Sequence, residues 1–175
     1  TLMYHEGAPG HHFQISSAQL IDNVPFLRTV GLFSGYIEGW ALYSERLAAV
    51  DMGMYDNYAL GDLGRLQAEM FRAVRLVVDT GMHDKRWSRE QAITYMLDKT
   101  GMTEAEVVRE IERYVVWPGQ ATAYKVGQLA ILKIRSLAER ELGEKFDIKQ
   151  FHEVILSTGA MPLDILESTI IDWVA

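Results

Sequence analysis

The fold class is decided by residues 56–81, which read DNYALGDLGRLQAEMFRAVRLVVDTG. The larger apolar residues recur mostly at intervals of three or four positions: Leu63, Leu66, Met70, Val74, Val77 and Val78. This spacing gathers them on one face of an α-helix and does not match the alternation of a β-strand. The sequence therefore predicts a helix over residues 56–80, and Gly81 is expected to end it.

Both flanks of this segment show the same helical pattern. On the N-terminal side, helices are expected over residues 13–22, as the continuation of a first helix, and over residues 35–52, with a break at Asn23-Val24-Pro25. On the C-terminal side, a capping box at Ser88-Arg89-Glu90-Gln91 precedes a helix over 89–99 that Gly101 stops, and a second capping box stands at Thr103-Glu104-Ala105-Glu106. Pro118 is expected at the start of a helix that runs to about Leu142. Asp147 precedes a helix near 148–157 that Gly159 ends, and Pro162 precedes a helix to Trp173. No strand-like alternation exceeds four residues, and no repeat or long linker is present, so we expect one all-α domain over residues 1–175.

Composition excludes several classes of function. The chain has 175 residues, a formal net charge of −7 and a pI near 5.2, which argues against a nucleic-acid-binding surface and against binding to an anionic membrane. No apolar run approaches the length of about 18 residues that a membrane span needs. There is no cysteine, so any metal must be held by histidine and carboxylate ligands, which suits zinc in a catalytic site.

The start of the chain already lies in the segment where we expect the active site. Thr1 leaves no room for a helix cap or a signal sequence before it. We therefore expect this chain to be the C-terminal part of a longer protein, with any localisation signal upstream. Apolar surface that such a truncation exposes could support a dimer.

Residues 4–12 read Tyr-His-Glu-Gly-Ala-Pro-Gly-His-His and hold three of the five histidines of the chain. In a zinc peptidase helix, His-Glu-x-x-His supplies two metal ligands, and the glutamate activates the metal-bound water. Here Pro9 stands where the second histidine is expected, so His11 reaches that place only if a bulge absorbs two residues. In a straight helix His12 faces the same side as His5 but lies roughly 10 Å further along. A polar helix end with clustered histidines is the alternative.

Glu38 is the candidate for the third metal ligand. It stands among apolar residues in Gly35-Tyr36-Ile37-Glu38-Gly39-Trp40, and a buried carboxylate normally has a partner or a metal. The alternative is a surface glutamate at a helix start. Gly39 lets another backbone or a substrate approach closely. Glu45, two turns further on, either orients a ligating imidazole or pairs with an arginine.

Residues 117–127 and two nearby positions are candidates for substrate contacts. Gln120 and Tyr124 share a helix face, where a phenol can donate to an oxyanion and an amide can bind a carboxylate, as can the adjacent Lys125. His83 is expected in a loop and could also donate to an oxyanion. Arg113 either clamps a substrate terminus or pairs with Glu110. Tight helix packing and solvated side chains are the alternatives at these positions.

Five motifs together resemble the bacterial domain-of-unknown-function 885 family. They are Tyr-His-Glu-Gly-x-Pro-Gly-His-His-x-Gln at 4–14, Glu-Gly-Trp-Ala-Leu-Tyr-Ser-Glu at 38–45, Asp-Thr-Gly-Met-His at 79–83, Trp-Ser-Arg-Glu-Gln-Ala at 87–92 and Trp-Pro-Gly-Gln-Ala-x-Ala-Tyr-Lys-x-Gly at 117–127. The family resembles the helical zinc peptidases called gluzincins, such as angiotensin-converting enzyme and the Taq-type carboxypeptidases. The resemblance implies the catalytic C-terminal part of such a fold.

The same resemblance implies a role for each candidate residue. The metal ligands would be His5, His11 and Glu38, the general base Glu6, the oxyanion donors Tyr124 and His83, and the carboxylate-binding residues Gln120 and Lys125. We therefore expect a Zn²⁺-dependent peptidase that acts on short peptides or other small amides. Two other functions stay open, a non-catalytic binding module that keeps the metal and a hydrolase of another amide or ester.

Overall fold

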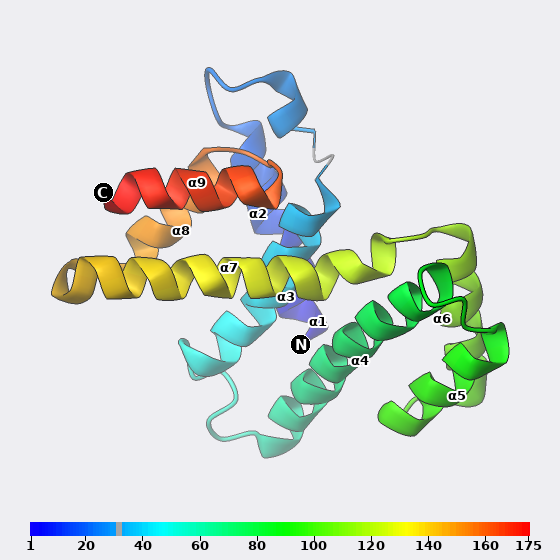
Figure 1. Cartoon of the computed structure of the whole chain (residues 1–175). Helices are drawn as coiled ribbons and strands as arrows, with labels where there is room; N and C mark the ends of the chain where they lie inside the picture. Colours follow the sequence, from blue (N-terminus) through cyan, green and yellow to red (C-terminus); the bar gives the residue numbers. More distant parts are fainter. Residues whose placement is uncertain (31–32) are drawn as a thin grey trace.

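The structure, a computed structural model, describes residues 1–30 and 33–175 and is built there from helices with no strand, which confirms the all-α prediction (Figure 1). None of the helices in these residues is long and apolar enough to cross a bilayer. The α-helices are α1 (Leu2–Glu6), α2 (His11–Gln19), α3 (Ser34–Val50), α4 (Ala59–His83), α5 (Arg89–Lys99), α6 (Glu104–Val116), α7 (Gln120–Leu142), α8 (Ile148–Ser157) and α9 (Leu163–Val174). Short 3₁₀ helices lie at Phe26–Arg28 and Gly143–Lys145.

Helices α3 and α7 cross in direct backbone contact at the centre of the molecule (Figure 1). A Cβ atom built on Gly39 would lie 2.5 Å from the Cα of Gly127, and one built on Gly127 would lie 1.9 Å from the carbonyl oxygen of Gly35. Only glycine permits this approach. The expectation that Gly39 admits another backbone is confirmed.

Two apolar cores lie on either side of this crossing. One joins α3 and the later turns of α7 to α8 and α9, and includes Trp40, Phe151 and Leu166. The other joins α4, α5 and α6 to the first turn of α7, and includes Val78 and Ile111. Figure 1 shows α4–α6 on one side of α7 and α9 on the other. Helix α7 is thus the element that the two cores share.

The C-terminal half follows the local sequence signals closely. Both capping boxes form, with the side chains of Ser88 and Thr103 accepting hydrogen bonds from the third residue of α5 and of α6. The side chain of Asp147 likewise accepts from the backbone N–H of Lys149 at the start of α8. These ends depend on contacts within four residues, which sequence reveals directly.

Two predicted helix boundaries are wrong. Gly81 does not end its helix, because α4 continues to His83; a Cβ on Gly81 would lie 2.6 Å from the ring of Trp87, so the glycine serves packing. Pro118 does not lie in the first turn of α7, because the helix begins at Gln120. The residue before α7 is Gly119, whose φ of +82° is a conformation that glycine adopts readily.

The N-terminal region differs most from the prediction. Residues 13–22 do not continue the first helix: α1 ends at Glu6, and a separate helix begins at His11. The intervening residues 7–10 form a turn, in which Pro9 supplies no backbone N–H to a continuing helix. The expected bulge is therefore a full break between two short helices, which lets the chain change direction before the second histidine.

Candidate metal centre

The turn between α1 and α2 folds tightly over the end of α1. A Cβ on Gly10 would lie 1.9 Å from the carbonyl oxygen of His5, so no larger residue fits there. The indole N–H of Trp40 donates to the carbonyl oxygen of Pro9 at 2.8 Å and fastens the turn to α3. As a result the rings of His5 and His11 lie edge to face, with centroids 4.8 Å apart and an interplanar angle of 90°. The break thus achieves what His-Glu-x-x-His achieves in one straight helix.

Glu38 completes a cluster with these two histidines. Its Oε2 lies 3.7 Å from Nε2 of His5 and 3.2 Å from Nε2 of His11, and the three ligand atoms all lie within 4.8 Å of one another. Ligand atoms about 2.0–2.2 Å from a tetrahedral zinc ion lie roughly 3.3–3.6 Å apart, so the spacing suits such an ion. The next residue, His12, is exposed and does not belong to the cluster. The geometry therefore favours His11 over His12.

A second carboxylate holds His5 from the other side. Nδ1 of His5 lies 2.7 Å from Oε1 of Glu45, and both side chains are almost fully buried. Glu45 also accepts a hydrogen bond from the hydroxyl of Thr1. In a neutral imidazole that donates Nδ1–H to Glu45, Nε2 carries a lone pair on the side of Glu38; in the protonated ring, Nε2–H interacts with Glu38 instead. Of the two roles considered for Glu45, the structure contains the contact with the imidazole.

The cluster keeps its carboxylates charged despite burial. Burial alone raises the pKa of Glu38, but hydrogen bonds from His11 and His5 outweigh it and lower the pKa to about 2. For Glu45, burial is likewise outweighed by hydrogen bonds from His5 and Thr1, and its pKa is lowered. Burial lowers the pKa of His5, but the bonds to Glu38 and Glu45 raise it overall. One buried and one partly buried carboxylate next to two imidazoles form a site suited to a cation.

Glu6 is adjacent to this cluster in sequence, and Tyr124 is adjacent to it in space. Glu6 follows the ligand His5, is exposed, and has no ion-pair partner among the described residues. The ring of Tyr124 stacks near the ring of His5, with centroids 6.2 Å apart and an interplanar angle of 19°. Its hydroxyl accepts a hydrogen bond from the amide of Gln120 at 3.2 Å and interacts with Glu38. Gln120 and Tyr124 therefore do share a face, and it is the face next to the cluster.

The remaining predicted residues have other partners. His83 is the last residue of α4 rather than a loop residue, and its Nε2 lies 3.0 Å from the carbonyl oxygen of Tyr114. The ammonium of Lys125 donates to Glu69 at 2.6 Å and to Gln128 at 2.7 Å. These partners hold both side chains away from the cluster. Sequence motifs did not reveal the partners, because they are distant in sequence or on the next turn. The roles assigned to His83 and Lys125 stay predictions without a supporting contact.

Of the two roles considered for Arg113, the structure contains the pairing with Glu110, and it adds a contact with Gln120. Its guanidinium lies 3.5 Å from a carboxylate oxygen of Glu110, and it donates at 2.8 Å to the side-chain oxygen of Gln120. Two further arginines of α4, Arg72 and Arg75, also lie at Tyr124. Sequence analysis missed them, although Arg75 stands three residues before Val78 on the apolar face of its helix, where an arginine is unexpected.

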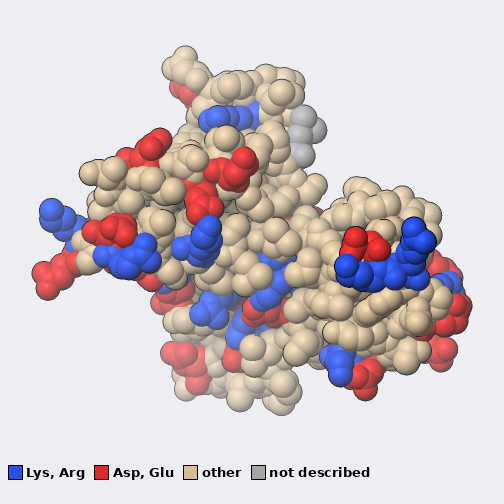
Figure 2. Space-filling model, viewed as in Figure 1, with Lys and Arg blue, Asp and Glu red and all other residues tan. Residues whose placement is uncertain are grey.

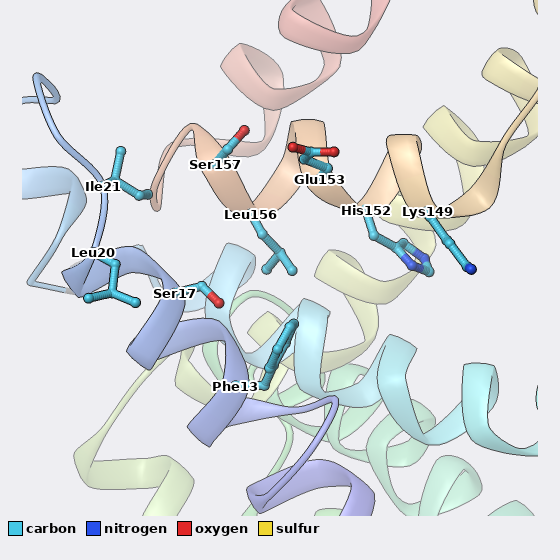
Figure 3. A pocket seen from close by; sticks show the side chains of 9 residues that line it. All are labelled: Phe13, Ser17, Leu20, Ile21, Lys149, His152, Glu153, Leu156 and Ser157. Atoms are coloured by element: carbon cyan, nitrogen blue, oxygen red, sulfur yellow. The ribbon is translucent and has the colours of Figure 1, made fainter.

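Two hollows lie near the cluster. A cavity of about 710 Å³ contains Glu38 and Gln120 in its wall, together with apolar residues of α2, α3 and the loop between them, such as Ile37, and with Trp117 from the loop between α6 and α7. A separate groove of about 610 Å³ runs between α2 and α8 (Figure 3) and is lined by Phe13, Ser17, Leu20, Ile21, Lys149, His152, Glu153, Leu156 and Ser157. The first hollow adjoins a candidate ligand and is the candidate substrate cleft.

The surface charge agrees with the composition. On the face drawn in Figure 2, acidic and basic side chains are interspersed, without an extended basic patch. Together with the net charge of −7, this pattern argues against a nucleic-acid-binding surface on that face.

Comparison with known proteins identifies the family. A family model described as "Bacterial protein of unknown function (DUF885)" matches residues 1–170, so the chain belongs to this family. A solved structure described as a "putative lipoprotein" from Colwellia psychrerythraea is 56% identical with a TM-score of 0.96; the match covers 99% of this chain and 29% of that one. Another, from Shewanella oneidensis, described as a "putative lipoprotein of unknown function", is 27% identical with a TM-score of 0.87, covering 97% of this chain and 31% of that one. This chain therefore spans less than a third of either protein, and no curated protein matches it.

Proposed function

We propose that this member of the DUF885 family carries the metal centre of a zinc-dependent hydrolase that cleaves peptide bonds or other small amide bonds. The observation that supports the proposal is the cluster of His5, His11 and Glu38, whose ligand atoms lie within 4.8 Å of one another. Two imidazoles and one carboxylate are a known ligand set of catalytic zinc sites, which leave a further coordination position for water or substrate.

The residues present fit a zinc ion in their chemistry as well as in their spacing. Each candidate ligand offers the atom that zinc prefers, and the Nδ1 atom of His5 has the carboxylate partner that commonly orients a zinc-bound histidine. The low pKa of Glu38 keeps it ionised at neutral pH. When bound, zinc supplies Lewis-acid polarisation of the scissile carbonyl and lowers the pKa of a bound water towards about 7.

The protein side chains have separate tasks in this proposal. The exposed carboxylate of Glu6 accepts a proton from the attacking water and later passes it to the leaving amine nitrogen. The hydroxyl of Tyr124 accepts a hydrogen bond from Gln120 and interacts with Glu38; with substrate bound, its proton would turn from Glu38 to the oxygen of the reacting carbonyl. The cavity beside Glu38 is large enough for a short peptide.

The first experiment measures zinc content by elemental mass spectrometry after loading and desalting. We expect about one zinc per chain in the wild type, none in Glu38→Gln or His11→Ala, and an unchanged content in His12→Ala. The last variant is the matched control, because His12 is the neighbouring histidine outside the cluster. Equal zinc in all four proteins would contradict the proposed site.

The second experiment tests hydrolysis with a panel of short peptides and acylated amines. We expect Glu6→Gln to keep its zinc and to lose activity by at least about 100-fold, the lower range for a general base. Zinc binding without hydrolysis of any substrate, in this chain and in a full-length relative, would instead favour a binding module that retains the metal.

A further inference from the structure

Three arginines converge on Tyr124, the residue that also contacts the metal cluster. The guanidinium carbon of Arg75 lies 4.2 Å from the centroid of the Tyr124 ring, and that of Arg72 lies 5.9 Å from it. Arg113 and Arg75 donate to the side-chain oxygen of Gln120, at 2.8 Å and 3.4 Å, and the amide of Gln120 donates to the Tyr124 hydroxyl. These arginines, which we call the arginine group, come from α4 and α6.

The arginine group holds more positive charge than nearby carboxylates can neutralise. Within 4.0 Å, the described residues offer it one carboxylate, Glu110, at 3.9 Å from Arg75 and 3.5 Å from Arg113. Glu110 also accepts a hydrogen bond from the Tyr114 hydroxyl at 2.6 Å. Arg72 has no carboxylate within that distance among the described residues. Two of the three guanidinium groups thus share one carboxylate, and the third has none within 4.0 Å among the described residues.

Part of this charge is buried with donors left unused. Arg75 is 2% exposed, and its Nε–H has no hydrogen-bond acceptor in the described part of the chain; the same is true of the Nε–H of Arg72. The rings of Phe71, Tyr114 and Tyr124 stabilise the Arg75 guanidinium from their faces, but they do not neutralise it. Buried cations with unfilled donors favour binding of an anion, above all a carboxylate, whose two oxygens match the guanidinium fork.

The arginine group is close enough to the metal cluster to take part of the same substrate. Tyr124 contacts Arg75 on one hand and the His5 ring on the other, so a single aromatic side chain connects the two sites. Gln120, which two of the arginines bind, forms part of the cavity wall together with Glu38. Lys125, the expected carboxylate partner, is instead held by Glu69 and Gln128.

We propose that Arg72, Arg75 and Arg113 form an anion subsite that binds a carboxylate of the substrate beside the metal centre. This inference rests on the proposed function and narrows its substrate class to short peptides that carry a carboxylate near the scissile bond. The carboxylate is either a free C-terminus or the side chain of an acidic residue. Arg113 is the more exposed member and contacts the incoming carboxylate first, and the buried Arg75 adds positive charge next to it.

Calorimetric binding to the zinc-loaded protein tests the subsite with four probes of equal length. The first pair is N-acetyl-dialanine with a free C-terminal carboxylate and its amide. The second pair is N-acetyl-alanyl-glutamic acid with an amidated terminus, with its side-chain carboxylate either free or amidated. We expect carboxylate-bearing probes to bind at least tenfold more tightly than their amides. The pair that shows the larger preference identifies the terminus or the side chain as the source of the carboxylate.

Variants assign the preference to the arginine group. Arg72→Gln and Arg113→Gln should each remove most of the tenfold preference while zinc content stays unchanged, and Arg109→Gln on α6, outside the group, should keep it. Equal binding of acids and amides by the wild type, or an unchanged preference in both variants, overturns the subsite. A preference that persists when the wild type binds no zinc would uphold the subsite and reject the metal centre, so the two proposals fail separately.

Discussion

His5 and His152 are two enclosed histidines in opposite electrostatic surroundings. His5 lies between the carboxylates of Glu38 and Glu45, and its pKa is raised although burial alone would lower it. The Nε2 atom of His152 lies 2.8 Å from the hydroxyl of Tyr43, which also accepts from Arg135 at 3.1 Å. Burial, and then the charge of Arg135, lowers the pKa of His152 to about 4.

Under the proposed function, the difference separates a metal-binding histidine from a structural one. Around His5 the fixed charges are negative, so a metal ion can replace a proton there. Around His152 the fixed charge is positive, although Arg135 is itself paired with Asp51 at 2.6 Å and 2.9 Å. Burial alone therefore does not mark a functional histidine; the sign of the charges next to it does.

The largest expected effect is the loss of zinc binding when His5 is replaced. His5→Ala should abolish zinc binding, because it removes one of the three protein ligands. His152→Gln, which keeps a hydrogen-bond acceptor for Tyr43, should bind zinc as the wild type does. Elemental analysis of both proteins after zinc loading makes the test, and loss of zinc in His152→Gln would refute the contrast.

Moving a ligand without removing it should have the next largest effect. In Gly10→Ala the new Cβ would start 1.9 Å from the His5 carbonyl oxygen and must move by about 1.5 Å to reach ordinary contact. We expect zinc affinity to fall by about 100-fold, the scale of a misplacement of 1 Å in a preorganised site. Competition with a chromogenic chelator measures the affinity.

Gly64→Ala is the control for this variant. A Cβ on Gly64, within α4, would meet no atom within 4 Å. Alanine there should leave zinc affinity unchanged and stabilise the fold by about 0.5–1 kcal/mol, because glycine is unfavourable inside a helix. Similar losses of zinc affinity in both variants would show that the tight turn is not the cause.

A smaller effect is expected from the carboxylate behind His5. Glu45→Gln keeps an acceptor for Nδ1–H but removes the charge, so zinc affinity should fall by about 10–100-fold. Glu69→Gln, which changes the partner of Lys125 instead, should leave it unchanged. Titration with zinc in a metal-buffered solution distinguishes these two results.

The smallest effect concerns the pH dependence of folding at His152. Its pKa is about 4 in the folded protein against an ordinary value of 6.5, so the unfolded chain binds the proton more readily. The stability linked to this group is fully present above pH 6.5 and is lost as pH falls from 6.5 towards 4. At pH 5.5 the loss is on the order of 1 kcal/mol.

Urea unfolding of the metal-free protein at pH 7.5 and pH 5.5 measures this loss. His152→Gln cannot gain the proton, so its unfolding free energy should change less between the two pH values. An identical change in the wild type and the variant would mean that other groups cause the pH dependence. The use of metal-free protein keeps zinc release at low pH out of the comparison.

The helices and the proximity of His5, His11 and Glu38 could be predicted from the sequence, but the wider site could not. The ligands Glu38 and His11 follow from residue type and spacing, because few residues bind zinc and the chain has no cysteine. Helix ends marked by Ser88 and Thr103 depend on local contacts and were predicted as well. A break or bulge at Pro9 and Gly10 was also predicted, and the structure has the break. In contrast, the direction of the chain after it and the pairing of Lys125 with Glu69 depend on tertiary packing, which no local pattern encodes.

The glycine contact between α3 and α7 also limits how the cleft can be remodelled. No side chain separates the two backbones at Gly39 and Gly127, so no smaller residue can be placed there to change the distance between the helices. The separation of the ligand on α3 from Tyr124 on α7 is thereby a fixed dimension of the scaffold. Engineering for larger or smaller substrates must instead act on the replaceable cavity wall, at Ile37 or Trp117.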